Sequence, residues 1–160
     1  MYLLEHDAKV LLGAGGVSVP AGCLVESVAQ VDGVALPPGP WVVKAQVPVG
    51  GRGKAGLVRI TDSRAALGGL VAGMLGKSHR GHTVGACRIE RASDAQHEVY
   101  VGFMLAPEAG GVRVLASARG GVEVESSGGV ESRVESHCSR LSPTFAELRP
   151  RKRWSAEARR

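Results

Sequence analysis

The chain has 160 residues, enough for one ordinary domain with a buried core. Hydrophobic residues make up 44% of it and aromatic residues only 4%, so the core must be aliphatic. The net charge of +5 is local, because residues 149–160 hold six basic residues and one acidic residue, whereas residues 1–148 hold fourteen of each. The body of the protein is therefore not basic, and the composition disfavours nucleic-acid binding.

Cysteine usage and hydropathy predict a cytoplasmic protein. The three cysteines, Cys23, Cys87 and Cys138, are widely spaced and form no CxxC pattern, which argues against a disulfide framework and for a reducing compartment. No basic segment precedes a long apolar run, so no signal peptide is expected. No stretch approaches the roughly 20 apolar residues that a membrane-spanning helix needs, so no membrane association is predicted.

The first forty residues predict one helix followed by short, irregular segments. Apolar side chains recur at helical spacing through residues 2–14, and a glycine pair at 15–16 provides a stop. An extended segment is expected to begin at Val17, and the sequence Pro-Pro-Gly-Pro at 37–40 predicts a loop. Gly33 and these prolines leave room only for a short or irregular helix.

The most informative stretch is residues 41–60, WVVKAQVPVGGRGKAGLVRI. Its first part is β-branched and apolar, which predicts a buried strand, and residues 57–60 predict a second one. Lys44 interrupts the first strand, and because an unpaired buried lysine is costly, it should face an anion or a cleft. Between the strands lies a loop with four glycines and two cations, Arg52 and Lys54. Backbone N–H groups and cations that converge in this way suit a polyphosphate.

Two familiar phosphate-binding motifs do not fit this loop. The pattern Gly51-x-Gly53-x-x-Gly56 formally matches the dinucleotide fingerprint, but that fingerprint opens a helix, and a strand is predicted to follow here. The P-loop pattern fails because Ala55 stands where Ser or Thr should bind magnesium, and Pro48 replaces the first glycine. On these residues alone, a solvent-exposed basic hairpin and a phosphate loop are equally good interpretations.

After the glycine loop the sequence predicts a helix over residues 64–77, capped by Asp62 or Ser63. Its apolar positions form one stripe, which is typical of a core-facing helix. Three glycines within it weaken the helix by up to about 1 kcal/mol each relative to alanine. The final part of the chain, residues 126–160, shows only weak periodicity.

Residues 77–85 predict a polar loop that contains His79 and His82. Two histidines without a cysteine or carboxylate beside them make a poor metal site, so a solvated loop is expected. Three strands follow, two of them joined by a short turn that makes them an antiparallel pair. These strands are expected at residues 86–90, 99–106 and 112–117.

The segment VVKAQV…GGRGKAG resembles the nucleotide-binding hairpin in the β subunit of succinyl-CoA synthetase and related ADP-forming acid–CoA ligases. Other segments of the family agree in order: MYLLEHDAKVLL (residues 1–12), GVSVPAG (16–22), IE with SD and EVYVG (89–102), and LAS with GGVE (115–123). The resemblance covers roughly residues 1–125, and several ordered motifs are more specific than one glycine loop. It implies the N-terminal part of an ATP-grasp fold, an α+β (α/β) class with mainly antiparallel sheets flanked by helices.

The resemblance also implies a division of the chain into three parts. Residues 1–20 and 94–125 would begin the larger ATP-grasp subdomain. Residues 21–93 would form the small subdomain, which carries the glycine-rich hairpin. Residues 126–160 are expected to be a degenerate or disordered basic tail.

Seven nucleotide-binding residues are implied by the match to the family's motifs. Lys44 would contact the α and β phosphates, and residues 51–53 would close over the nucleotide. Glu90 and Ser93 would form the hinge beside the adenine pocket, and Glu98 would accept hydrogen bonds from the ribose hydroxyls. The full set is Lys44, Gly51, Arg52, Gly53, Glu90, Ser93 and Glu98.

In the family, ATP or GTP phosphorylates a histidine of a partner α subunit, the phosphoryl group passes to a carboxylic acid, and CoA displaces it. The resemblance therefore implies a succinate–CoA ligase (ADP-forming) of the tricarboxylic acid cycle, working with an α subunit, CoA and a carboxylic acid. Mg²⁺ would balance the charge. Its Asn and Asp ligands are expected beyond this chain, so no catalytic or metal-binding residue is assigned within it.

Two interpretations of the isolated chain stay open. It is either the nucleotide-binding portion of such an enzyme, incomplete without the metal ligands and the α subunit, or a truncated non-catalytic paralogue. The paralogue would bind nucleotide weakly or only associate with a ligase subunit. The sequence chooses neither the carboxylic acid nor ATP over GTP.

Overall fold

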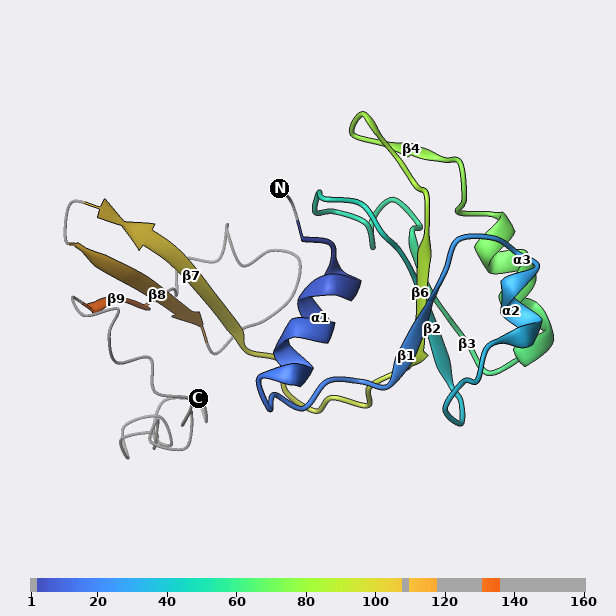
Figure 1. Cartoon of the computed structure of the whole chain (residues 1–160), viewed down its shortest axis with the longest axis horizontal. Coiled ribbons are helices and arrows are strands. Elements are labelled where there is room, and N and C mark those ends of the chain that lie inside the picture. The colour runs from blue at the N-terminus through green and yellow to red at the C-terminus, as the bar shows by residue number, and fades with distance from the viewer. Residues whose placement is uncertain (1–2, 108–109, 118–130, 136–160) are drawn as a thin grey trace, which may run out of the picture.

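The computed structural model describes residues 3–107, 110–117 and 131–135, and its paired strands are all antiparallel (Figure 1). The helices are α1 (Glu5–Ala14), α2 (Gln30–Gly33), the 3₁₀ turn η1 (Arg64–Ala66) and α3 (Leu67–Ala72). The strands are β1 (Gly22–Val25), β2 (Trp41–Ala45), β3 (Val58–Thr61), β4 (Ser78–His79), β5 (His82–Thr83), β6 (Cys87–Arg91), β7 (Tyr100–Ala106), β8 (Gly111–Ser117) and β9 (Glu131–Glu135). Short helices on antiparallel sheets confirm the predicted α+β class.

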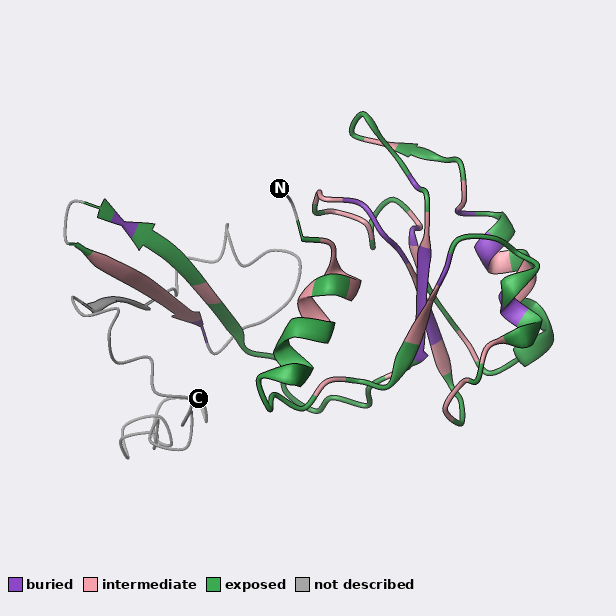
Figure 2. Ribbon diagram, viewed as in Figure 1, coloured by how far each residue is buried: buried purple, intermediate pink, exposed green. Residues whose placement is uncertain are grey.

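A four-stranded sheet with the order β1-β6-β2-β3 forms the centre of the fold. Side chains of a strand alternate between its two faces, so Val43 and its neighbour Ile89 lie on one face and Lys44 and Arg88 on the other. Helices α2 and α3 cover the first face (Figures 1 and 2). There they bury an aliphatic core that includes Val31, Leu67 and Val71. Each such side chain contributes about 1.5–3 kcal/mol when fully buried.

Helix α1 lies against the opposite face of this sheet, and it does so through polar contacts. The helix ends at Ala14 as its apolar spacing predicts, but it begins at Glu5, later than expected; Gly15 is its C-cap and Gly16 follows at φ 83°. None of its residues is buried, and Leu11 and Leu12 remain exposed. Instead, the backbone N–H of His6 donates to Gln46 Oε1 at 2.9 Å. The helix is therefore held by charges and hydrogen bonds rather than by an apolar seam.

The close approach of β1 to β6 depends on a glycine. Gly22 pairs with Glu90, and a Cβ added at Gly22 would lie 2.7 Å from the Cα of Glu90 and still closer to its Cβ and to the carbonyl oxygen of Ile89. Backbone atoms cannot yield as a flexible side chain can, so a larger residue would push the two strands apart. Gly22 thus fixes the distance between β1 and the buried Glu90.

The helix predicted over residues 64–77 is shorter than expected. It starts as the turn η1 and ends at Ala72, with Gly73 as the C-cap. The predicted side-chain cap is also wrong, because the Ser63 N–H donates to Thr61 Oγ1 and no side chain caps the helix. The glycines that weaken helical conformation account for the early stop. The apolar stripe is confirmed as core, because Leu67, Val71 and Met74 are buried.

Residues 77–85 form a tight hairpin rather than the expected polar loop. Strands β4 and β5 pair across a two-residue turn, with Arg80 at φ 48° and Gly81 at φ 82°. Positive φ at both central residues defines a type I′ turn, the geometry that matches the twist of a hairpin. The short loop at 37–40, the short helix α2, and the strands β2, β3 and β6 are confirmed at or near their predicted positions.

Strands β7, β8 and β9 form a separate three-stranded sheet (Figure 1). The antiparallel β7–β8 pair is confirmed, and β9 pairs with β8 where the sequence predicted a degenerate tail. The rest of the predicted tail, including all of 136–160, lies outside the described residues, and the division into subdomains stays a prediction. No helix in the described ranges is long and apolar enough to cross a membrane.

Candidate functional site

Lys44 lies at the centre of the polar face of the four-stranded sheet. Strand β2 lies between β6 and β3, so Lys44 is not a solvated lysine on an edge strand. Its Nζ lies 2.6 Å from Oε1 of Glu90 and 3.1 Å from Oε1 of Glu5 on α1. Lys44 therefore faces an anion, as predicted, and in this structure the anions are two carboxylates of the protein itself.

Glu5 joins helix α1 to both the sheet and the glycine loop. Its Oε1 accepts from Lys9 at 2.8 Å, one helical turn further along α1, and also contacts Lys44. Its Oε2 accepts from Arg52 Nη2 at 2.7 Å. Arg52 Nη1 donates to the carbonyl oxygen of Ala45 at 2.9 Å. One carboxylate thus holds two of the predicted phosphate-binding cations, Lys44 and Arg52.

Glu90 is the buried anion of the site, with only 1% of its surface exposed. Arg88, also buried, donates from Nε to Glu90 Oε2 at 2.6 Å, and Lys9 donates to both carboxylate oxygens at 2.7 Å. Arg88 also contacts Nδ1 of His6 at 2.8 Å, and since a guanidinium only donates, Nδ1 is the acceptor. His6 is therefore neutral in this arrangement.

We call these six charged side chains the ion cluster, and it has an excess of positive charge. It contains four cations and two carboxylates, a net charge of +2 with His6 neutral. An anion can bind here without first having to overcome a net negative field. The members of the ion cluster are Glu5, Lys9, Lys44, Arg52, Arg88 and Glu90.

Burial and ion pairing shift the pKa values of three members of the ion cluster. Burial raises the pKa of Glu5, but the hydrogen bond from Lys9 and the charges of Lys44 and Arg52 lower it more, to about 2. Burial also raises the pKa of Glu90, and its hydrogen bonds from Lys44, Lys9 and Arg88 leave it below the ordinary value. Burial lowers the pKa of Lys44, and its bonds to Glu90 and Glu5 reverse that shift and raise it. All three groups are therefore charged at neutral pH.

The lowered pKa of Glu5 predicts a loss of stability in acid. A carboxylate whose pKa is lower in the folded than in the unfolded state stabilises the fold above its unfolded pKa, near 4.5, and loses this contribution as pH falls towards 2. The free energy of unfolding, measured with urea at several pH values, should fall across this range. The slope should be shallower in Glu5→Gln and unchanged in Asp62→Asn, which removes an exposed carboxylate that forms no ion pair within the described ranges. Equal slopes in all three proteins would contradict the pairing.

The glycine loop, residues 50–56, has a backbone arrangement suited to an anion. Ala55 N–H donates to the carbonyl oxygen of Gly51 at 3.2 Å, and Leu57 N–H to that of Arg52 at 2.9 Å. By contrast, the N–H groups of residues 51–53 donate no backbone hydrogen bond within the described part of the chain. Gly51 has φ 78°, a conformation that favours glycine. The N–H groups of Gly51, Arg52 and Gly53 are thus available as donors to an anion.

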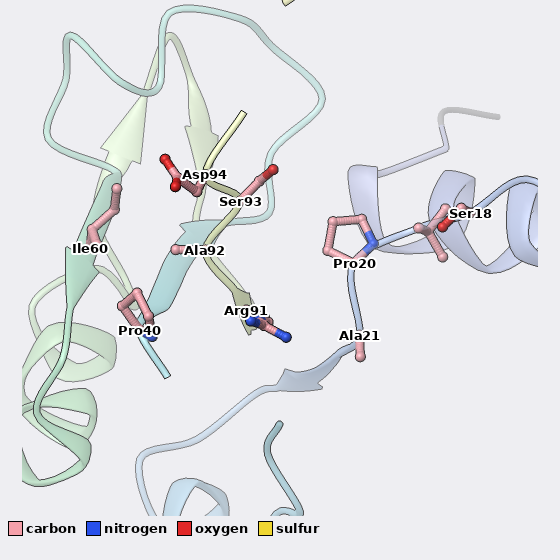
Figure 3. Close-up of a pocket in the computed structure, with 10 residues that line it drawn as sticks. Ser18, Pro20, Ala21, Pro40, Ile60, Arg91, Ala92, Ser93 and Asp94 are labelled. Carbon is pink, nitrogen blue, oxygen red and sulfur yellow. The ribbon is translucent and has the colours of Figure 1, made fainter. Parts of the chain in front are cut away.

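Ser93 lies in a different part of the site, at the edge of an open hollow. This hollow has a volume of about 900 Å³. Figure 3 shows Ser93 and Asp94 near Ile60, with Pro20 and Ser18 on the other wall. Ile60 belongs to the cross-strand row Gly22–Glu90–Val42–Ile60, which lies on the same face of the sheet as Lys44. The hollow and the ion cluster therefore share one face.

Glu98 is a predicted site residue that lies neither in the ion cluster nor among the residues that line the hollow. It lies in the exposed segment between β6 and β7 and forms no hydrogen bond or ion pair with another described residue. Its expected ribose contact stays a prediction. Four contributors were missed from the sequence: Glu5, Lys9, His6 and Arg88. The i,i+4 spacing of Glu5 and Lys9 and the alternation of Arg88 with Glu90 were the signals present.

Among the comparisons with known proteins, the model for the ATP-grasp domain matches residues 2–130. The succinate–CoA ligase [ADP-forming] subunit beta of Halobacterium salinarum is 38% identical over 127 residues, covering 79% of this chain and 33% of that protein. Subunit beta 2 of Streptomyces coelicolor is 38% identical over 126 residues, with coverage of 78% and 33%. A probable malate–CoA ligase subunit beta of Mesorhizobium japonicum is 37% identical over 134 residues, with coverage of 78% and 34%.

These matches confirm the resemblance to β subunits of acid–CoA ligases that the glycine hairpin predicted. The chain spans about a third of the length of the curated relatives it matches. The family model, by contrast, covers most of the chain, including the hairpin, the ion cluster and strands β7 and β8. The chain therefore belongs to the ATP-grasp family.

Proposed function

We propose that this chain is the nucleotide-binding portion of a cytoplasmic succinate–CoA ligase (ADP-forming) β-subunit-like protein, and that it binds ATP or GTP on the polar face of the four-stranded sheet. The observation that carries the proposal is that Lys44 and Arg52 meet at one carboxylate, Glu5, and that Arg52 lies in a glycine loop whose residues 51–53 donate no backbone hydrogen bond within the described part of the chain. Cations and oriented backbone donors together are the chemistry that binds polyphosphate.

The carboxylate of Glu5 occupies the position beside Lys44 and Arg52 that phosphate oxygens would take. The Glu5 carboxylate pairs with both cations, so it keeps them charged and close together. A triphosphate carries more negative charge than one carboxylate and would compete with Glu5 for them. Arg52 would then leave Glu5, and the glycine loop would be free to close over the phosphates.

The base and ribose would extend from the phosphates along the sheet towards Ser93. Ile60 is 70% exposed beside the hollow and offers an apolar surface for a purine ring. Ser93 lies at the same hollow and would contribute backbone groups at the hinge. Glu90 would not contact the nucleotide itself. Its carboxylate is paired with Lys9, Lys44 and Arg88, so its role would be to orient Lys44.

The described residues do not fit a magnesium site. No group of three His, Cys, Asp or Glu side chains converges within the described ranges. Glu5 and Glu90, the two carboxylates at the ion cluster, are already paired with cations. These residues are therefore assigned to binding and orienting the nucleotide, and no step is assigned to a metal.

In the complete enzyme, we infer that the nucleotide held here would serve phosphoryl transfer. An α subunit, CoA and a carboxylic acid would be the partners, by analogy with the relatives named as succinate–CoA or malate–CoA ligase subunits. What this chain contributes is charge and position, because phosphoryl transfer depends mainly on alignment and on stabilising the charge of the phosphoryl oxygens.

Calorimetric titration of the purified chain tests this proposal. We expect saturable binding of ATP or GTP, with a smaller heat and a weaker affinity for AMP, which lacks the β and γ phosphates. Each nucleotide is titrated with and without Mg²⁺, and folding is checked by circular dichroism. A folded chain that binds none of the three would overturn the proposal and favour a non-catalytic protein that only associates with a ligase subunit.

A further inference from the structure

The β4–β5 hairpin brings another arginine to the glycine loop. Arg80 is the first residue of the hairpin's two-residue turn, and its φ of 48° is the only positive φ of a non-glycine residue in the described ranges. A Cβ added at Gly51 would lie 3.3 Å from Arg80 Nη2 and 3.6 Å from its Cζ. The guanidinium therefore lies directly against the backbone of Gly51.

His79 joins the hairpin to this loop. Its Nε2 lies 2.9 Å from the carbonyl oxygen of Gly50, and because a carbonyl only accepts, Nε2 carries the proton. The hairpin is two residues long on each side, so this bond fixes the turn that holds Arg80 close to the loop. The position of Arg80 is thus set by the turn to which it belongs and by the hydrogen bond of its neighbour His79 to Gly50.

Arg80 differs from Lys44 and Arg52 in having no carboxylate partner among the described residues. Lys44 and Arg52 are paired with Glu5, whereas Arg80 forms no ion pair with any described residue. The guanidinium of Arg80 is exposed and lies against the backbone of Gly51. An incoming anion could therefore bind it without first breaking an ion pair.

We infer that Arg80 binds the terminal phosphates of the nucleotide and that the β4–β5 hairpin forms a second wall of the phosphate site. The inference rests on the proposed nucleotide binding and adds a specificity: the hairpin makes the site favour triphosphate over monophosphate. Arg80 and the N–H groups of residues 51–53 would hold the phosphates from one side, and Lys44 and Arg52 from the other.

The variant Arg80→Asn tests this inference with little damage to the turn. Asn-Gly is a preferred pair for a type I′ turn, so asparagine can replace Arg80 at positive φ, whereas alanine would be strained there. The matched control is Arg59→Gln. Arg59 lies against Gly56 at the other end of the same loop, but its strand position pairs with Val43, so it points to the opposite face.

Calorimetric titrations with ATP, ADP and AMP give the decisive comparison. We expect Arg80→Asn to weaken ATP binding about tenfold, the effect of losing one charge-assisted hydrogen bond, and to leave AMP binding unchanged. Arg80→Lys should restore part of the affinity, and Arg59→Gln should match the wild type. If the wild type binds ATP and Arg80→Asn binds it equally well, the inference is wrong and the proposed function stands. If the folded wild type binds no nucleotide, both fail.

Discussion

Replacing Glu90 with alanine should lower the free energy of unfolding by about 3–5 kcal/mol, because it leaves buried cations without their anion. Arg88 is 4% exposed and donates to Glu90 at 2.6 Å, and Lys9 and Lys44 point at the same carboxylate. The residual partners of Arg88, His6 and the carbonyl oxygen of Pro20, are neutral and cannot balance its charge. A loss of this size is a large part of the stability of an ordinary domain, about 5–15 kcal/mol.

Urea unfolding of three variants separates this effect from a general intolerance to substitution. Glu90→Gln keeps the shape and the acceptor oxygen, so it should cost less than Glu90→Ala. Glu98→Ala removes an exposed glutamate that pairs with no described residue, and it should change stability by no more than about 0.5 kcal/mol. The double variant Arg88→Met, Glu90→Ala should recover part of the loss, since no buried guanidinium is then left unpaired. A Glu90→Ala protein as stable as Glu98→Ala would contradict the buried ion cluster.

The strands on either side of the glycine loop could be predicted because their signals are local. Val42 and Val43 are β-branched and apolar, and glycines interrupt the pattern where the chain turns. The interruption by Lys44 also predicted a facing anion from the cost of burying a lone charge. What the local pattern could not supply was the identity of that anion, because Glu5 is 39 residues away in the chain.

The way helix α1 packs was the largest gap between sequence and structure. Its leucines at helical spacing suggest an apolar seam, yet Leu11 and Leu12 are exposed and the contact is made by Glu5 and Lys9. A periodic pattern reports which residues share a face of a helix. It does not report which face the rest of the protein covers, and that depends on contacts distant in sequence.

The predictions of a longer helix after β3 and of an open loop at 77–85 were wrong for a different reason. Both depend on glycine, whose conformational freedom gives several outcomes of similar energy. Gly73 ended a helix that the apolar stripe would have continued, and Gly81 allowed a type I′ turn in place of an open loop. Tertiary contacts such as the bond from His79 to Gly50 then selected one outcome.

The four-stranded sheet has an aliphatic face that α2 and α3 cover and a charged face that helix α1 and the glycine loop cover. Lys44 is the point where these elements meet. Lys44 lies on β2, an inner strand of the sheet that leads directly into the glycine loop. It contacts both carboxylates of the ion cluster. Removing its charge should therefore affect nucleotide binding more than any other single change.

Titration of Lys44→Met with ATP, beside the wild type and Lys77→Met, tests this central claim most directly. Methionine keeps most of the side-chain stem, and both Glu5 and Glu90 retain Lys9 and a further arginine, so the variant should fold. Lys77 is an exposed lysine that forms no ion pair with a described residue and serves as the matched control. We predict saturable binding by the wild type and by Lys77→Met, and an affinity at least 100-fold weaker in Lys44→Met, a loss of about 2.7 kcal/mol, because Lys44 would contact both the α and the β phosphate. Equal binding by all three proteins would contradict the claim that Lys44 and the glycine loop form a phosphate site.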